Sequence, residues 1–190
     1  GDNAPRMIVE GVDTAVDQLS HVRFLLYGDE TLLQPLLDSH PHASAVSEVR
    51  HTDEVISNNE KPGVALRGGA NSSMRLAIDA VKSGEAAGVI SAGNTGALMA
   101  MAKFVLKTLP GIDRPAIATY YPTQRSESVM LDLGANVECN ANNLVQFAVM
   151  GEVFARNVLG LENPSIGILN VGAEGLKGNE AVKKAAETLQ

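Results

Sequence analysis

The chain has 190 residues and a formal net charge of −7, and 45% of its residues are hydrophobic but only 4% aromatic. This length can bury a sizeable core, and the abundance of small aliphatic residues favours helices packed on a sheet over an aromatic-rich β-sandwich. The acidic balance argues against a nucleic-acid binder, because such proteins usually present a basic face.

Composition also limits the covalent and metal chemistry that we expect. Cys139 is the single cysteine, so no internal disulfide forms, which fits a reducing compartment. His40 and His42 bracket a proline, but no cysteine or carboxylate cluster near them has the spacing of a metal site. No apolar run approaches the roughly 18–20 residues of a membrane span, and no signal peptide opens the chain. We therefore expect a soluble, cytoplasmic protein without a metal site.

In the first part of the chain, apolar periodicity alternates between that of a helix and that of a strand. A proline near the start and apolar residues on one side predict the first helix. The expected elements are a helix over Pro5–Asp17, a strand over Val22–Tyr27, a helix-like stretch to Leu37, a loop over His40–Ser44, a strand over Ala45–His51, a polar stretch over Thr52–Glu60 and a helix over Ser72–Lys82.

Residues 88–106, GVISAGNTGALMAMAKFVL, place a loop of small residues between a strand and a helix. We predict that Val89 and Ile90 end a buried strand. Leu98, Met101 and Val105 recur at helical spacing, which predicts that a helix follows the loop.

The second part of the chain predicts a hairpin and a further strand between helices. Two β-like runs, Pro115–Tyr121 and Ser128–Leu133, flank the polar loop Pro122–Glu127, which predicts an antiparallel hairpin. A helix is expected over Leu144–Leu159, a strand over Ser165–Val171 and a helix over Lys177–Gln190. The alternation indicates an α/β fold with a mixed, mostly parallel sheet, covered by helices on both faces.

We treat residues 1–190 as a single α/β catalytic domain, because no long linker or clear change of composition divides them. A boundary near Pro110–Pro115 is the alternative. A strand normally precedes the first helix of such a fold, and the last helix has nothing after it. We expect that a first strand and a C-terminal portion belong to the complete protein.

The loop Ser91–Gly96 is the first of three unusual loops at expected strand ends, where α/β proteins bind ligands. Gly93 and Gly96 let a ligand approach the main chain, and Asn94 or Thr95 is suited to cap the next helix. A helix N-terminus offers N–H groups and a partial positive charge that suit phosphate. The plain alternative is a tight turn with an ordinary cap.

Asp132, in the second loop, follows an apolar strand and must meet a donor, a helix N-terminus or solvent. It either caps a neighbouring turn or orients a substrate or a basic partner, and Gly134 and Asn136 belong to the same candidate site.

In the third loop, glycines surround Glu174 and Lys177, whose ammonium group can carry positive charge to a phosphate or an oxyanion. The alternative is a flexible loop with solvated charges. The candidate residues of this loop are Asn170, Gly172, Glu174, Lys177, Gly178 and Asn179.

Residues outside these loops are weaker candidates. Ser72 or Ser73 is expected to be a helix cap, and Arg67 has an anion contact as its alternative to a solvated cation. His51 is either an acid–base residue or an ordinary hydrogen-bonded loop histidine.

Several phrases in order along the chain together resemble the bacterial phosphate acyltransferase family (PlsX). They are GDNAP at 1–5, HTDEVI at 51–56, SSM at 72–74, SAGNTGALM at 91–99, GIDRPA at 111–116, LDLGANV at 131–137, LVQFAVMG at 144–151 and NVGAEGLKGNE at 170–180. The resemblance implies transfer of a fatty acyl group from acyl carrier protein to inorganic phosphate, which gives an acyl phosphate for phospholipid synthesis. It also implies a three-layer fold similar to isocitrate and isopropylmalate dehydrogenases, a homodimer and peripheral membrane association, and it implies no cofactor.

With this resemblance, the residues suggest a mechanism in which no side chain acts as nucleophile. Gly93, Asn94, Thr95 and Gly96 would bind phosphate or the oxyanion, with Ser91 in the same loop. Charge stabilisation is expected from Lys177 with Asn179 as a donor, orientation from Asp132 and Asn136, and at most a minor acid role from His51. Because acyl carrier protein is acidic, a local basic patch from Lys103, Lys107 and Arg114 is expected.

Three other functions remain open from the residues. They are a phosphotransacetylase-like transfer from acyl-coenzyme A, a non-catalytic acyl-carrier or lipid-sensing module, and a nucleotide-dependent dehydrogenase. The last is disfavoured, because the chain has no G-x-G-x-x-G with a distant acidic residue.

Overall fold

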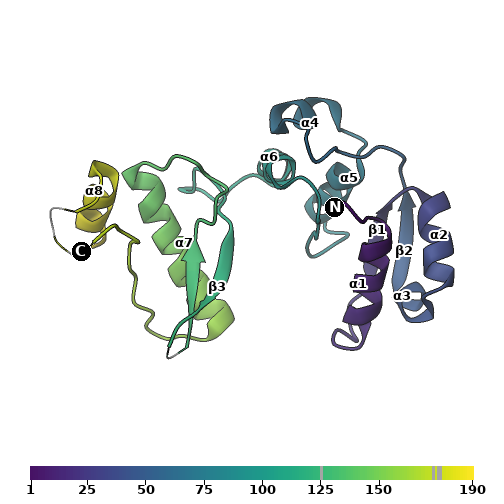
Figure 1. The fold of residues 1–190 in the computed structure, drawn as a ribbon, viewed down its shortest axis with the longest axis horizontal. Coiled ribbons are helices and arrows are strands. Elements are labelled where there is room, and N and C mark those ends of the chain that lie inside the picture. Colours follow the sequence, from purple (N-terminus) through teal and green to yellow (C-terminus); the bar gives the residue numbers. More distant parts are fainter. Residues whose placement is uncertain (125, 173, 175–176) are drawn as a thin grey trace. The chain divides into compact units, whose positions relative to one another are not determined.

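The computed structural model describes residues 1–124, 126–172, 174 and 177–190, and they form two compact units, Gly1–Lys107 and Thr108–Gln190. In Figure 1 the first unit runs from purple to teal, and the second continues through green to yellow. That the whole chain is one catalytic domain stays a prediction.

The first unit is built on a pair of parallel strands, β1 and β2, in which Phe24 lies opposite Ser47 and Gly28 opposite His51. Helices α1, α2 and α3 gather around this pair (Figure 1). The elements are α1 Arg6–Val16, β1 Phe24–Gly28, α2 Glu30–Asp38, α3 Pro41–Val46, β2 Ser47–His51, α4 Pro62–Gly68, α5 Ser73–Ser83 and α6 Thr95–Leu106.

Two buried clusters stabilise the first unit. One joins α1, α2, α3 and β1, and it consists of Val9, Val12, Leu26, Leu33, Leu37 and Ala43. The other joins the three helices α4, α5 and α6. On α6 its members recur every fourth residue, which forms one apolar stripe along the helix. The second cluster consists of Ala65, Met74, Ile78, Ala97, Met101 and Val105.

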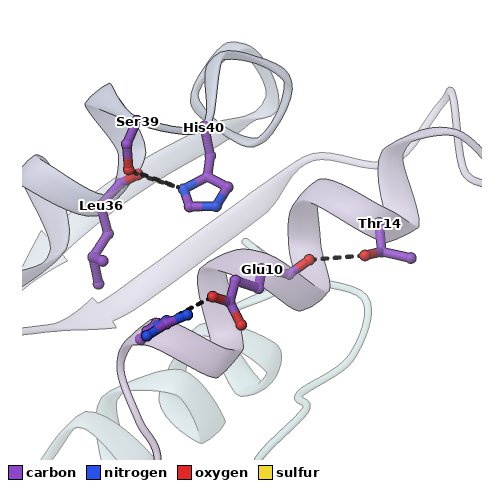
Figure 2. Close-up of polar contacts among 6 residues, drawn as sticks. Glu10, Thr14, Leu36, Ser39 and His40 are labelled. Carbon is purple, nitrogen blue, oxygen red and sulfur yellow. Dashed lines mark hydrogen bonds and ion pairs between the residues drawn. The ribbon is translucent and has the colours of Figure 1, made fainter.

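The corner between α2 and α3 is closed by short polar contacts (Figure 2). The Ser39 hydroxyl donates to the Leu36 carbonyl at 2.8 Å, and His40 Nδ1 lies 2.8 Å from the same oxygen. Because a carbonyl only accepts, this imidazole carries its proton on Nδ1.

On α1, the Thr14 hydroxyl donates to the Glu10 carbonyl at 3.0 Å, as Figure 2 also shows.

The sequence predicted a loop over His40–Ser44, and this was wrong because residues 41–46 form α3. Pro41 occupies the first helical position, where its missing N–H costs nothing. The Asp13 carboxylate accepts the Ala43 N–H at 3.0 Å, a contact from α1 that local sequence does not reveal.

The second unit contains an antiparallel hairpin and two helices, as the sequence predicted. Strand β3, Ala118–Pro122, pairs with β4, Glu127–Leu131, and α7, Ala141–Leu159, packs against β4 with α8, Glu180–Leu189, beside it (Figure 1). A capping box of Asn140 and Asn143 begins α7.

Two predicted strands are absent from the described residues. Val89–Ile90 and Ser165–Val171 have no strand hydrogen bonds there, and Ile90, Leu169 and Val171 are 91%, 85% and 86% exposed. An apolar run becomes a strand only when a neighbouring backbone pairs with it, and neither run has such a neighbour in this part of the structure. The chain is therefore mixed α/β, with one parallel and one antiparallel pair of strands among the described residues.

Helix α4 was not predicted, whereas the cap of α5 was. The Ser72 hydroxyl accepts the Arg75 N–H at 3.3 Å, which confirms it as the N-cap. In the described ranges, no helix is long and apolar enough to cross a bilayer.

Candidate functional site

The N-terminal turn of α6 is capped by Asn94. Its side-chain Oδ1 accepts the Ala97 N–H at 3.0 Å, and its backbone carbonyl accepts the Leu98 N–H at 2.9 Å. These bonds satisfy the third and fourth N–H groups of the helix start. The sequence offered Asn94 or Thr95 as the cap, and the structure gives Asn94.

The other end of the Asn94 side chain fixes this turn to a distant loop. Its amide nitrogen lies 3.1, 3.2 and 2.8 Å from the carbonyl oxygens of Ser57, Asn58 and Glu60. Asn58 in turn donates from its side chain to the Asp2 carboxylate at 2.6 Å. The Asn94 side chain is thus fully used in structure, so its side chain orients the turn rather than reaching a ligand.

The first two N–H groups of α6 remain available. Thr95 and Gly96 are exposed, and their N–H groups donate to no acceptor in the described part of the chain. The start of α5 differs, because the Ser73 N–H already donates to the Glu54 carbonyl at 2.9 Å. The α6 turn therefore offers an anion two adjacent N–H donors and the positive end of a helix dipole.

Packing explains why glycine occupies positions 93 and 96 of this loop. A Cβ on Gly96 would lie 2.8 Å from Pro62 Cγ, at the start of α4. A Cβ on Gly93 would lie 3.3 Å from Met74 Cε, and its N–H donates to Ser91 Oγ at 3.2 Å. The Gly93 amide is therefore occupied internally, whereas the N–H groups of Thr95 and Gly96, at the first two positions of α6, stay open to a ligand.

His51 and Arg67 lie elsewhere in the first unit. His51 is exposed at the end of β2, and its Nδ1 accepts the Glu30 N–H at 3.2 Å, which leaves the proton on Nε2. No hydrogen bond joins His51 to residues 91–96 in the described chain. Arg67 lies in the last turn of α4, and its side chain is exposed.

In the second unit, the Asp132 carboxylate holds two loops together. Its Oδ1 accepts the Ile117 N–H at 2.7 Å, and its Oδ2 accepts the backbone and side-chain N–H groups of Asn136 at 2.7 and 3.2 Å. Asn136 also donates to the Pro115 carbonyl at 3.0 Å, and Gly134 between them has φ +90°. These bonds fit a residue that orients its loop more than one that exchanges protons with a substrate.

A groove of about 460 Å³ opens beside this network. Its walls come from β4, α7 and residues 161–169, with apolar side chains such as Leu131, Phe147 and Ile166. Asp132, Asn136 and Cys139 also line it. Burial raises the pKa of the Cys139 thiol, and the nearby Asp132 charge raises it further, while Arg114 acts in the opposite direction. The thiol is thus a weak nucleophile.

The turn before α8 contains the remaining candidates. Asn179 caps α8 by accepting the Val182 N–H at 2.9 Å, and Asn170 donates to the Lys177 carbonyl at 3.2 Å. Gly178 has φ +91°, and a Cβ there would lie 2.7 Å from Asn170 Oδ1, so only glycine fits this turn.

Lys177 is exposed and forms no ion pair with another described residue. The Glu174 carboxylate folds back, so that a Cβ on Gly172 would lie 2.6 Å from its Oε2. Residues 173, 175 and 176 of the predicted loop lie outside the described residues. A cation without a carboxylate partner is available to an anionic ligand.

The predicted site residues are thus divided between the two units. The first unit contains His51, Arg67, Ser72 and the Ser91–Gly96 loop, and the second contains the candidates from Asp132 to Asn136 and from Asn170 to Asn179. The sequence analysis did not predict that the Ser57, Asn58 and Glu60 carbonyls hold Asn94, or that Pro62 packs against Gly96. A proline at the first position of a helix could have indicated the start of α4 at Pro62. No group of three or more metal-ligating side chains occurs in the described ranges.

The chain matches known proteins over its whole length. The family model described as fatty acid synthesis protein matches residues 1–190. The phosphate acyltransferases of Rhodospirillum centenum and Paramagnetospirillum magneticum are 63% and 61% identical to it over 190 residues. Each match covers 100% of this chain and 54% of the relative, so the chain spans about half the length of these relatives.

A third relative, the phosphate acyltransferase of Rhodospirillum rubrum, is 60% identical over 190 residues, again 100% of this chain and 54% of the relative. A match over every residue, together with identities this high, leaves no part of the chain outside the family. The chain therefore belongs to the fatty acid synthesis protein family, that of the bacterial phosphate acyltransferases.

Proposed function

We propose that the protein transfers a fatty acyl group from acyl carrier protein to inorganic phosphate and so supplies acyl phosphate for phospholipid synthesis. Its relatives with identities of 60–63% are phosphate acyltransferases, which supports this proposal. No cofactor is needed for such a transfer.

The observation that carries the proposal is the first turn of α6. Its Thr95 and Gly96 N–H groups face no internal acceptor among the described residues, and Asn94 holds the turn with one cap bond and contacts to three distant carbonyls. Donors that are already positioned lose little freedom when an anion binds, which favours both binding and rate.

The reaction that we propose is a direct displacement. A phosphate oxygen attacks the thioester carbonyl carbon, a C–O bond forms, and the electron pair of the breaking C–S bond leaves with the carrier thiolate. Phosphate is already an anionic nucleophile near neutral pH, so no serine or cysteine has to be activated. The thiolate takes its proton from solvent.

Each candidate side chain then has a distinct role. Lys177 stabilises the negative charge that develops on the carbonyl oxygen, and Asn179 supports it as a donor. Asp132 and Asn136 are positioning residues for their loop. His51 is at most a minor acid through Nε2.

The finer fold and assembly are part of the same proposal. We expect a three-layer, mostly parallel sheet of the isocitrate dehydrogenase type in the complete protein, which would give the apolar runs at Val89–Ile90 and Ser165–Val171 strand neighbours. We also expect a homodimer that associates peripherally with the membrane.

The test is a phosphate-dependent assay with the full-length protein. Acyl-carrier thioester, acyl-coenzyme A and acyl-pantetheine with the same acyl group are compared, and thioester loss and acyl phosphate are both measured. The proposal predicts phosphate-dependent turnover that is fastest with the carrier thioester. Faster turnover of acyl-coenzyme A would favour the phosphotransacetylase-like alternative, and binding without acyl phosphate would favour a non-catalytic module.

A further inference from the structure

Gly1 and Asp2 lie against the turn that precedes α6. A Cβ on Gly1 would lie 2.9 Å from the Ala92 carbonyl oxygen and 3.2 Å from Ala92 Cβ, and a Cβ on Gly93 would lie 4.0 Å from the Gly1 nitrogen. The Asp2 carboxylate accepts a side-chain N–H of Asn58 at 2.6 Å. These two residues therefore contact both the loop before α6 and the loop whose carbonyls hold the α6 cap.

The loop that holds the α6 cap, residues 57–60, is closed locally but lies at the surface. The Glu60 N–H donates to the Ser57 carbonyl at 3.1 Å, which closes a tight turn. Among the described residues, Asn58 is the one member of this loop whose side chain forms a hydrogen bond outside it, and the partner is Asp2. The Asp2 carboxylate thus ties this loop to a segment 56 residues earlier in the chain.

The charge of Asp2 is unfavourable beside a bound anion unless the carboxylate has another use. A carboxylate near an anion weakens its binding, because like charges repel. The same charge makes the bond to Asn58 stronger than a bond between two neutral groups. A carboxylate that is tied to the support of an anion-binding turn therefore indicates a structural contribution to that turn.

We propose that Asp2 is a positioning residue for the turn that begins α6. Its carboxylate fixes Asn58, so that the loop presents its carbonyls to the Asn94 amide. The capped turn then holds the Thr95 and Gly96 N–H groups in one direction. This rests on the proposed function, in which those N–H groups bind phosphate. Asp2 acts through the loop and the cap, and it exchanges no proton with the substrate.

Asp2→Ala in the full-length protein separates positioning from charge, because the two effects have opposite signs. Loss of positioning should raise the dissociation constant and the KM for phosphate about three- to tenfold. Loss of a nearby negative charge alone would lower both. At saturating phosphate, kcat should stay within about twofold, since the bound phosphate itself then orders the turn. KM for the carrier thioester should not change.

A conservative variant and a double-mutant cycle test the hydrogen bond itself. Asp2→Asn keeps an acceptor oxygen, so it should leave the phosphate dissociation constant within about twofold of the wild-type value or lower it. Asn58→Ala removes the partner side chain but keeps the carbonyl that faces Asn94. It should weaken phosphate binding as much as Asp2→Ala, and the double variant should be no weaker than either single variant.

Exchange of the two partners, Asp2→Asn with Asn58→Asp, restores a charged hydrogen bond with donor and acceptor reversed and keeps the net charge. It should recover most of the phosphate affinity. Thermal unfolding identifies any variant that is too unstable to titrate. The exchanged pair then decides, because phosphate affinity that it fails to recover overturns the proposal.

The matched control is Asp17→Ala. Asp17 is an exposed residue that follows the far end of α1, and its side chain has no hydrogen bond or ion pair in the described ranges. Its removal makes the same change of net charge in the same unit and should leave phosphate binding unchanged. Hydrogen exchange of the Ala97 amide, which the Asn94 cap protects, should become faster in Asp2→Ala but not in Asp17→Ala.

Phosphate binding that is unchanged or tighter in Asp2→Ala overturns the proposal, as does an equal loss in Asp17→Ala or additive losses in the double variant. Failure of the proposed function is separate, because the wild-type protein would then show no phosphate-dependent loss of thioester. Phosphate titration and the Ala97 exchange rate still decide the positioning role in that case, and an unchanged exchange rate in Asp2→Ala overturns it.

Discussion

The turns that precede α6 and α8 have the same capping chemistry but different anchoring. Asn94 and Asn179 each accept the N–H three residues ahead, at 3.0 and 2.9 Å. The Asn94 amide also reaches carbonyls 34 to 37 residues earlier in the chain. The second turn is tied only by local bonds among the described residues, such as Asn170 to Lys177 seven residues on.

This difference suggests a distinct role for each turn. Donors in the α6 turn are fixed before an anion arrives, which suits them to hold the phosphate in one orientation. Lys177 lies in the turn with local bonds, and we propose it for the charge that develops during the reaction. Both turns expose N–H groups at the start of a helix, so anchoring, and not hydrogen-bonding capacity, distinguishes them.

The largest expected effect comes from a methyl group placed in each turn. Gly96→Ala puts a Cβ about 2.8 Å from the Pro62 ring, so α4 or α6 must move, and we expect a loss of about 2–3 kcal/mol. In Gly172→Ala, the nearest atoms are Glu174 Oε2 at 2.6 Å and Lys177 Cγ at 3.0 Å, both on exposed side chains that can move, and we expect a loss of less than about 1 kcal/mol.

Urea unfolding of both variants measures the difference between these glycines. Phosphate-dependent turnover should fall at least tenfold in Gly96→Ala only. Equal losses of stability would show that the two turns are anchored alike.

Removal of the two caps gives the next largest difference. Asn94→Ala loses a cap and leaves the Ser57, Asn58 and Glu60 carbonyls without this donor, so it should cost about 2 kcal/mol. Asn179→Ala loses only the cap and should cost about 1 kcal/mol. Thermal unfolding measures both, and a smaller loss in Asn94→Ala would contradict the anchoring.

The Lys177→Ala variant tests the effect of the Lys177 charge on turnover separately from any effect on the stability of the fold. Because the side chain is exposed and without an ion pair among the described residues, unfolding should change by less than about 0.5 kcal/mol. Phosphate-dependent kcat should fall about tenfold or more, since the charge that we propose to stabilise the oxyanion is lost. Lys177→Arg should recover part of it, and unchanged kinetics in Lys177→Ala would remove the residue from the site.

The smallest effect concerns the Cys139 thiol in the groove. Since burial and Asp132 raise its pKa, less thiolate is present near pH 8 than in an ordinary cysteine. Alkylation by iodoacetamide should therefore be slower than in a reference peptide, and its rate should rise at higher pH than in that peptide. A rate profile equal to that of the peptide would show that the thiol is not sheltered.

Local signals predicted the parts of the fold that depend on neighbours in sequence. The hairpin, the Ser72 cap and the candidate cap Asn94 follow from residue types at short spacing, and the structure has all three. The three carbonyls that hold Asn94, and the contact of Gly96 with Pro62, join residues 34 or more apart and leave no local pattern.

The wrong predictions have a related cause. The apolar runs at Val89–Ile90 and Ser165–Val171 have the composition of strands, but composition does not provide the second backbone that a strand needs. The sequence analysis interpreted the small residues of the Ser91–Gly96 loop as space for a ligand. The structure adds a second reason for Gly96, because Pro62 packs against it. One residue can meet a packing demand and a binding demand together, and only the contacts separate them.

Phosphate titration followed by amide NMR tests the central claim most directly. With the full-length protein and its Asn94→Ala variant as control, the account predicts that the Thr95 and Gly96 amide resonances shift saturably with phosphate, and that Asn94→Ala weakens the response about tenfold. It also predicts little change at Gly93, whose N–H is already bonded to Ser91. Saturable phosphate binding that leaves the Thr95 and Gly96 amides unmoved would contradict it.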